Sequence, residues 1–213
     1  MKSLLVILAM TIAAALFVAG LKQQWWPVPR QWNPFMPLVV SDPVTPVTRW
    51  KLKRIGDDRQ ACLAALDTVS EGDLDYLPLK DYTPVQACPL KNVVRVRSAG
   101  VRFNHSFVAR CPLALAWAMF ERHQLQPQAK AVFGQPVREV WHYGTFACRN
   151  IYHREDDRRS DHATASALDV AAFTLVDGTR ISVLDHWNDD GKRGDFLHRA
   201  RDGACQFFGT TLS

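Results

Sequence analysis

A histidine and an aspartate seven residues apart are the side chains of this sequence best suited to metal binding. His162 lies among small residues that let a loop fold closely, and Asp169 stands within an apolar run over 167–176 that predicts a buried strand. An ionised carboxylate in a buried strand loses much of its hydration unless a cation replaces the water. Imidazole nitrogen and carboxylate oxygen both suit Zn²⁺. The pair therefore predicts a metal site. The alternative is an aspartate that pairs with an arginine or caps a turn, beside an ordinary loop histidine.

The elements that would position this pair predict an α+β domain. Helical and strand patterns alternate in mixed order, and Asp177-Gly178 between two apolar runs is typical of a hairpin turn. This order indicates a small antiparallel sheet with helices packed against it. The expected helices cover 59–69, 112–120, 127–134 and 196–209, and the expected strands cover 94–97, 101–103, 137–143, 167–176 and 180–184.

The N-terminal segment predicts a transmembrane helix. Residues 4–21 are uncharged and apolar, and at about 1.5 Å of rise per residue they approach the thickness of the hydrocarbon layer. Small residues at 18–20 leave a cleaved signal peptide as the alternative, whereas Trp25 and Trp26 favour an uncleaved anchor. We expect residues 1–22 to be one or the other. The anchored form would be single-pass in the cytoplasmic membrane, with its domain on the periplasmic or extracytoplasmic side.

Composition divides the remaining chain into a spacer and one domain. Six of the 12 prolines lie between Trp25 and Pro46, so residues 23–50 predict a stiff juxtamembrane spacer or a strap on the surface. Residues 51–213 can bury one ordinary core. The net charge of +5 suits an anionic cell envelope or reflects a solvated basic face. No nucleic-acid motif accompanies this charge, so we expect no nucleic-acid partner.

Five cysteines are scattered without any Cys-x-x-Cys pair, which argues against a zinc ribbon or a thioredoxin-like site. In an exported protein they are expected to form disulfides, and the odd count leaves one thiol unpaired. Cys148 and Cys205 flank the candidate metal pair, and a bond between Cys62 and Cys88 would close a modest loop. We predict these two disulfides, which leaves Cys111 free.

Four ordered segments of the chain resemble the bacterial extensin-like C-terminal domain family. The resemblance covers residues 51–213, and Cys111-Pro112 and Trp117 are also in the style of the family. The Ser-x-His-x6-Asp block is similar to that of zinc D-Ala-D-Ala carboxypeptidases and the wider lysostaphin and hedgehog-type metallopeptidase fold. The segments are Phe146-Ala147-Cys148-Arg149-Asn150, the block from Ser160 to Phe173, Asp177-Gly178-x-Arg180-Ile181-Ser182-Val183, and the stretch from Phe196 to Gly209.

This resemblance implies a hedgehog or D-Ala-D-Ala-carboxypeptidase-like fold and a zinc hydrolase of peptidoglycan peptides. His162 and Asp169 would be two metal ligands. Arg149 would be the catalytic residue near the substrate, where it holds a peptide carboxylate or steadies a developing oxyanion. A salt bridge from Arg149 to Asp169 or another acid is the alternative. Ser160 would donate a hydrogen bond near the site or cap the turn before His162.

The sequence departs from the family at the third zinc ligand. A catalytic zinc has three protein ligands and one open position, and the resemblance places the third in a C-terminal His-x-His. No histidine follows His198. We therefore expect an incomplete and inactive site, either because the chain lacks the C-terminal end of the domain or because the natural protein has lost its site. His186 is a weaker candidate ligand, and His105, His142, His153 and His198 have no comparable context. The general base is unassigned, because Glu155 is the only glutamate near the motif and has no further support.

Two functions are compatible with these observations. The first is a membrane-anchored, zinc metallopeptidase-like hydrolase of cell-wall peptides. The second is a non-catalytic module that binds peptidoglycan or another part of the envelope and keeps the fold without the chemistry. The basic charge, the proline-rich spacer and the missing third ligand fit the second function.

Overall fold

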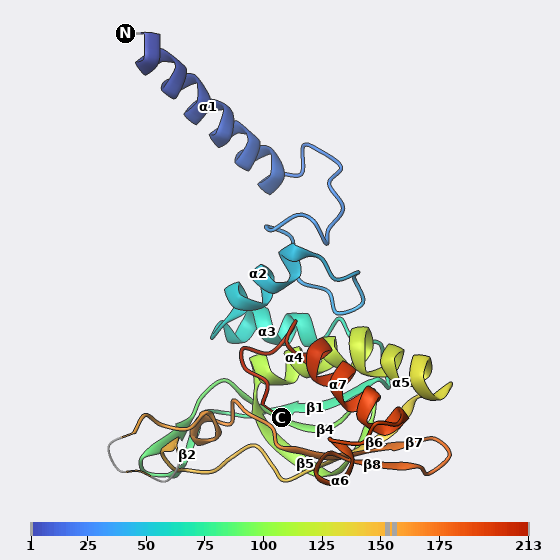
Figure 1. The fold of residues 1–213 in the computed structure, drawn as a ribbon. Helices are drawn as coiled ribbons and strands as arrows, with labels where there is room; N and C mark the ends of the chain where they lie inside the picture. The colour runs from blue at the N-terminus through green and yellow to red at the C-terminus, as the bar shows by residue number, and fades with distance from the viewer. Residues whose placement is uncertain (1, 152–153, 155–156, 213) are drawn as a thin grey trace.

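The computed structural model describes residues 2–151, 154 and 157–212. His153 and Glu155 lie outside these residues. The first element, α1 (Lys2–Lys22), has a mean hydropathy of 2.7 and is long and apolar enough to cross a membrane, as a signal sequence near an N-terminus also is. Figure 1 shows α1 projecting away from the rest of the chain. The predicted apolar helix is confirmed, while the choice between an anchor and a signal sequence stays a prediction.

A six-stranded sheet in the order β1-β4-β5-β6-β7-β8 forms one layer of the domain. Its neighbouring strands are antiparallel except β5 and β6, which are parallel, so the sheet is mixed where an antiparallel one was predicted. A parallel pair needs a crossover connection, and the helices between β5 and β6 supply it. β2 and β3 form a separate pair. The strands are β1 (Leu74–Pro78), β2 (Tyr82–Val85), β3 (Cys88–Leu90), β4 (Val93–Ala99), β5 (Arg102–Arg110), β6 (Val137–His142), β7 (Val170–Leu175) and β8 (Arg180–Ser182).

Helices cover the side of this sheet that faces α1, as Figure 1 shows for α3, α4, α5 and α7. These four correspond to the four helices predicted from the sequence, and Gly134 ends α5 in the left-handed conformation with φ 75°. The α+β class is therefore confirmed. The helices of the domain are α2 (Pro46–Ile55), α3 (Arg59–Leu66), α4 (Cys111–Phe120), the π-helical η1 (Glu121–Leu125), α5 (Gln126–Phe133), the 3-10 turn η3 (Asp161–Thr164), α6 (Val183–His186) and α7 (Lys192–Ala204).

Helix α4 forms the centre of the core. Pro112 lies in its first turn, where a missing amide hydrogen costs no helical hydrogen bond. The sequence predicts one apolar stripe on this helix, whereas every residue of α4 except Pro112 is buried. The reason is that α4 contacts β4 and β5 on one side and α3 and η1 on others. A helix surrounded in this way is apolar on all faces.

The disulfides join Cys62 to Cys111 and Cys88 to Cys148, and Cys205 keeps a free, exposed thiol. The predicted pairs, Cys62 with Cys88 and Cys148 with Cys205, are therefore wrong. Cys62 and Cys111 are both fully buried and meet because α3 packs on α4. Loop length does not reveal such a contact, because it depends on how distant elements pack. Two disulfides are typical of a protein that folds in an oxidising compartment.

The proline-rich segment between α1 and α2, residues 23–45, packs on the domain and is called the strap below. The ammonium group of Lys51, a buried residue of α2, donates a hydrogen bond to the carbonyl oxygen of Arg30 (2.7 Å). The side-chain amide of Asn33 donates to the carbonyl oxygen of Leu21 at the end of α1 (2.8 Å). The strap is therefore tied both to the membrane helix candidate and to the domain.

Candidate metal centre

Asp169 lies at the end of the β6–β7 ladder. Its backbone amide donates to the Gly144 carbonyl (3.2 Å), and its own carbonyl accepts from the Tyr143 amide (2.8 Å). The predicted strand over 167–176 is shorter in the structure, where β7 begins at Val170, and the side chain of Asp169 is 59% exposed. The expectation of a carboxylate inside a buried strand is therefore wrong. Burial alone gives no reason for a cation at this residue.

His162 is positioned by the short turn η3. Ser160 caps this turn, because its hydroxyl oxygen accepts a hydrogen bond from the His162 amide (3.3 Å). Of the two roles expected for Ser160, the structure therefore shows the capping role. The turn ends at Ala165, whose φ of 55° lies in the left-handed region and whose side chain is fully buried. The side chain of His162 is 14% exposed, so its ring is held against the fold.

Both ring nitrogens of His162 face oxygen acceptors. Nδ1 lies 3.1 Å from the Thr145 carbonyl oxygen, and Nε2 lies 3.3 Å from Asp169 Oδ1. A neutral imidazole carries a single N–H, so it can donate to only one of these oxygens. With that hydrogen on Nδ1, the lone pair of Nε2 faces a carboxylate oxygen. In this tautomer the contact becomes attractive when a metal ion lies between the two atoms, whereas in the other tautomer Nε2 donates its hydrogen to Asp169 directly.

The distance between His162 Nε2 and Asp169 Oδ1 suits two ligands of one zinc ion. Donor atoms about 2.0–2.2 Å from a tetrahedral zinc lie about 3.3–3.6 Å from each other, and the structure has 3.3 Å. The Thr145 carbonyl supplies the outer acceptor that usually holds the other nitrogen of a zinc-bound histidine. The exposure of Asp169 leaves room for further ligands and for water. The donor atoms, their separation and the outer hydrogen bond therefore fit Zn²⁺.

Two ligands are fewer than a catalytic zinc requires. Within residues 2–151, 154 and 157–212, no three His, Cys, Asp or Glu side chains are close enough to share an ion. His186 does not complete the site, and its Nδ1 accepts a hydrogen bond from the Ser182 amide (2.9 Å). Other described histidines are held elsewhere: His142 Nε2 contacts the His105 carbonyl (3.0 Å), and His198 Nε2 contacts the Trp187 carbonyl (3.1 Å).

Comparison with known protein families gives one match. Residues 60–213 match the family described as extensin-like protein C-terminus. The chain belongs to this family. No curated protein and no solved structure matches the chain. The matched range contains His162 and Asp169, so the candidate metal centre belongs to the extensin-like domain, while α1, the strap and α2 precede it. The family predicted from four motifs is confirmed, and the relation to zinc carboxypeptidases stays a prediction.

Arg149 of the extensin-like domain lies on the segment that pairs with the loop of His162. The Arg149 carbonyl accepts from the Ser160 amide (3.1 Å), and its guanidinium donates to the Asn150 carbonyl (3.4 Å). Among the described residues of this region, the ion pairs join Arg158 to Asp161 and His162 to Asp169. The alternative of a salt bridge from Arg149 to Asp169 is therefore not formed. Among the residues that the structure describes, no ion pair to Arg149 is formed by any acid.

A small second core supports this segment. Leu90, Val93 and Ala165 are buried together, and Phe146 packs against them. The disulfide between Cys88 and Cys148 joins β3 to the same segment, two residues beyond Phe146. The Thr145 carbonyl and the turn of His162 are therefore held by packing on one side and by a covalent bond on the other.

Removal of this disulfide is expected to loosen the metal centre selectively. In a variant with Cys88→Ser and Cys148→Ser, amide hydrogen exchange at residues 145–149 and 162–165 should accelerate at least about 10-fold relative to β4, because a covalent link no longer restricts local opening. Hydrogen-exchange mass spectrometry measures this ratio. Cys205→Ser removes a thiol without breaking a disulfide and should leave it unchanged. Uniform acceleration over the whole domain would contradict a local role.

The sequence analysis missed the groups that hold His162 in place. Thr145 contributes a backbone carbonyl, which no side-chain pattern reveals. Gly144, with φ 116°, lets the chain turn between β6 and Thr145, and a glycine directly after the predicted strand 137–143 was the available signal. The bond from Cys88 to Cys148 was missed, because the sequence analysis assigned each of these cysteines to another partner.

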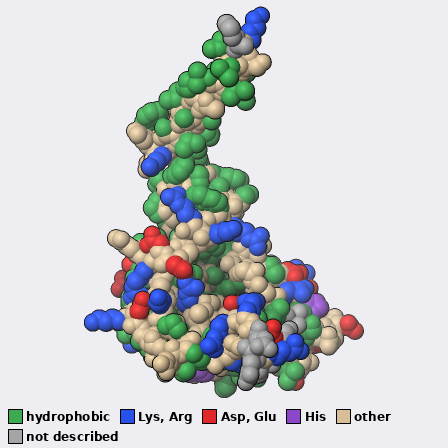
Figure 2. All heavy atoms as spheres, turned by 90° about the vertical axis from the view of Figure 1, so that its left-hand side faces the viewer, with side chains coloured by type: hydrophobic (Ala, Val, Ile, Leu, Met, Phe, Trp, Pro, Cys, Tyr) green, Lys and Arg blue, Asp and Glu red, His purple; other side chains and the backbone are tan. Residues whose placement is uncertain are grey.

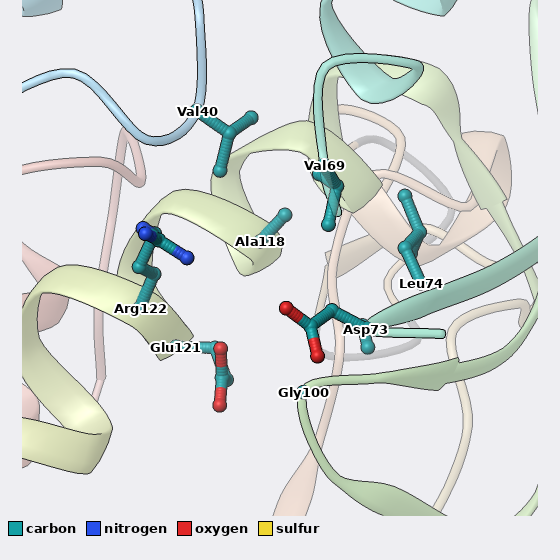
Figure 3. A pocket seen from close by; sticks show the side chains of 9 residues that line it. Val40, Val69, Asp73, Leu74, Gly100, Ala118, Glu121 and Arg122 are labelled. Atoms are coloured by element: carbon teal, nitrogen blue, oxygen red, sulfur yellow. The ribbon is translucent and has the colours of Figure 1, made fainter. Parts of the chain in front are cut away.

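A small cavity of the extensin-like domain lies away from this centre, between η1 and the β4–β5 turn. Its volume is ≈ 20 Å³, enough for about one water molecule. Figure 3 shows the carboxylates of Asp73 and Glu121 on facing sides of it. Burial raises the pKa of Glu121, whose Oε1 accepts a hydrogen bond from Gln126 (2.9 Å). His162 and Asp169 do not line this cavity.

Proposed function

We propose that the extensin-like domain is a zinc metallopeptidase-like hydrolase of cell-wall peptides, held outside the cytoplasmic membrane by α1 and inactive as given because its third zinc ligand is missing among the described residues. The observation that carries the proposal is the pair of contacts made by His162, with Nδ1 on the Thr145 carbonyl (3.1 Å) and Nε2 on Asp169 Oδ1 (3.3 Å). This arrangement has the spacing of two zinc ligands, and the Thr145 carbonyl is the kind of outer acceptor that a zinc-bound histidine has. The relation to zinc carboxypeptidases and the peptidoglycan substrate belong to the same proposal.

Each residue of the site would have a separate role in this reaction. His162 and Asp169 would hold a zinc ion, which would supply an acidified water molecule and a Lewis acid for a carbonyl group. The Thr145 carbonyl, which lies 3.1 Å from Nδ1, orients the ring of His162 so that Nε2 faces Asp169. Arg149 binds the carboxylate of the peptide by charge-assisted hydrogen bonds. Among the described residues no third His, Cys, Asp or Glu side chain joins His162 and Asp169, and the general base is unassigned.

Helix α1 and the disulfides support the proposed location. An uncleaved α1 would cross the cytoplasmic membrane once, and the two disulfides favour a domain on the oxidising, extracytoplasmic side. A cell-wall substrate is accessible on that side. The same placement would hold for a cleaved signal sequence, with the domain released from the membrane.

The test is a digestion of purified peptidoglycan by the zinc-loaded chain, as given and extended by a C-terminal His-x-His segment that supplies the third ligand. We expect soluble peptide products, detected by mass spectrometry, from the extended chain alone, and these products should disappear with a chelator, with Asp169→Asn and with Arg149→Gln. Asp161→Asn makes the same chemical change on an exposed neighbour and should leave the products unchanged. Absence of products from the extended chain at any zinc concentration would contradict the hydrolase.

A non-catalytic module that binds peptidoglycan is the second candidate. It is favoured by the two-ligand site, since among the described residues no third ligand accompanies His162 and Asp169. This candidate predicts that the chain sediments with peptidoglycan without cleaving it, and that Asp169→Asn does not alter the bound fraction. Binding that requires zinc together with Asp169 would favour the hydrolase.

A further inference from the structure

The positive charge of the chain is concentrated beside α1. Between Lys22 and Arg54 the sequence has six basic residues and one acidic residue, whereas the remainder has twenty of each. The net charge of +5 therefore resides entirely in this stretch. Four of the seven tryptophans lie in the same stretch, at positions 25, 26, 32 and 50. Basic residues and tryptophan are the two types that gather where a protein meets lipid headgroups.

Helix α2 presents these residues on one face. Arg49, Trp50, Lys53 and Arg54 are exposed at helical spacing, and the guanidinium of Arg54 lies over the Trp50 ring, 5.2 Å from its centroid. The opposite face turns inward, with Lys51 buried. α2 contains no acidic residue. The outer face thus combines cations with an aromatic ring, and two of its guanidinium groups also donate to backbone carbonyls, Arg49 to Cys205 (3.0 Å) and Arg54 to Pro34 (3.4 Å).

The strap contributes exposed aromatic side chains next to this face. Trp25, Trp26 and Trp32 are 59%, 41% and 52% exposed. Figure 2 shows hydrophobic side chains continuing from α1 over the strap, with lysine and arginine side chains below them on the domain. We call the exposed tryptophans of the strap and the outer face of α2 the collar.

The collar is fixed relative to the end of α1. Asn33 in the strap bonds the carbonyl of Leu21 (2.8 Å), and Thr45, the residue before α2, donates through its hydroxyl to the Gln31 carbonyl (2.7 Å). Lys51 ties α2 to the strap as described above. These bonds hold α2 within reach of the surface of any bilayer that α1 enters. A flexible linker would not impose this proximity.

We propose that the collar binds the anionic headgroups of the bilayer that holds α1. This inference rests on the membrane anchoring included in the proposed function. Lipid headgroups are the ligand that fits this surface for three reasons. The collar continues from α1, the whole net positive charge of the chain lies beside it, and its tryptophans are typical of a membrane interface. Docking orients the domain with its helices toward the bilayer and its sheet on the far side, as in Figure 1.

The test reconstitutes the full chain in vesicles and measures how strongly brominated lipids quench Trp50. The Trp50 signal is the difference between the unmodified chain and Trp50→Phe. In vesicles with about 30 mol % phosphatidylglycerol, we expect this quenching to be at least about 2-fold stronger than in phosphatidylcholine alone. A variant with Arg49→Gln, Lys53→Gln and Arg54→Gln should lose the difference. A control with Lys80→Gln, Lys91→Gln and Arg138→Gln, three exposed cations elsewhere, should keep it.

The outcomes separate the two proposals. Flotation of the chain with vesicles after an alkaline wash tests the insertion of α1, and its failure would reject the anchoring together with the collar that depends on it. Flotation with equal Trp50 quenching in both lipids would reject the collar alone. Equal loss of quenching in the test and control variants would also reject it, since net charge rather than the collar would then be responsible.

Discussion

Substitution of His162 by alanine should abolish stoichiometric zinc binding, with a loss of affinity of at least about 100-fold. The expectation follows from the position of Nε2, which faces Asp169 Oδ1 at 3.3 Å while Nδ1 is held by the Thr145 carbonyl. Loss of an outer hydrogen-bond partner alone typically costs about 10–100-fold in metal affinity, so loss of a ligand costs more. Asp169→Asn keeps the shape of the side chain but removes its charge, and should lower the affinity for zinc by at least about 10-fold. Isothermal titration calorimetry on the full chain in detergent measures both effects.

Two matched variants control this experiment. His198→Ala removes an exposed histidine on α7, and Asp161→Asn neutralises the residue directly before His162. Both should bind zinc as the unmodified chain does. Zinc binding that survives His162→Ala but is lost with His198→Ala would show that the ion binds near His198. That result would contradict a metal centre at His162 and Asp169.

The largest change in stability is expected from loss of the disulfide between Cys62 and Cys111. This bond joins two fully buried residues of α3 and α4 across a sequence separation of 49. Chain entropy for a loop of this length gives about 4 kcal/mol. The variant with Cys62→Ser and Cys111→Ser also buries two hydroxyl groups in an apolar core, which adds to the loss. The free energy of unfolding, from urea titration of the full chain in detergent, should fall by at least about this amount.

A variant that removes the free thiol provides the comparison. Cys205→Ser changes an exposed residue and should alter the free energy of unfolding by less than about 0.5 kcal/mol. A double variant of Cys62 and Cys111 that unfolds at the same urea concentration as the unmodified chain would show that packing of α3 on α4 is sufficient without the bond.

Much of the fold was predictable because local patterns and tertiary packing agree. The alternation around Val94 and Val96 predicts β4, Pro112 marks the first turn of α4, and Asp177-Gly178 predicts the turn between β7 and β8. In each case a short stretch of sequence is enough for the prediction, because it contains either apolar residues with a period of two or a residue with a restricted φ. The parallel pairing of β5 with β6 was missed, because it depends on where in the sheet the helical connection after β5 places β6.

The candidate site was predicted less completely. The sequence indicates that His162 and Asp169 act together, and the structure brings their side chains to 3.3 Å. The physical reason given for the pair was wrong, since Asp169 lies just before β7 and is exposed. The stronger argument is that both nitrogens of His162 face acceptors, and the Thr145 carbonyl, a backbone atom, is invisible in any pattern of side chains. The disulfides were also missed, because their partners meet only in the folded chain.

The central claim is that His162 and Asp169 share one divalent ion. X-ray diffraction from zinc-soaked crystals of the full chain, with anomalous data collected on both sides of the zinc absorption edge, tests it most directly. The account predicts one strong anomalous peak about 2.0–2.2 Å from both His162 Nε2 and Asp169 Oδ1. An anomalous peak beside other residues would contradict this claim. The absence of any peak in crystals where His162 and Asp169 remain in contact would contradict it as well.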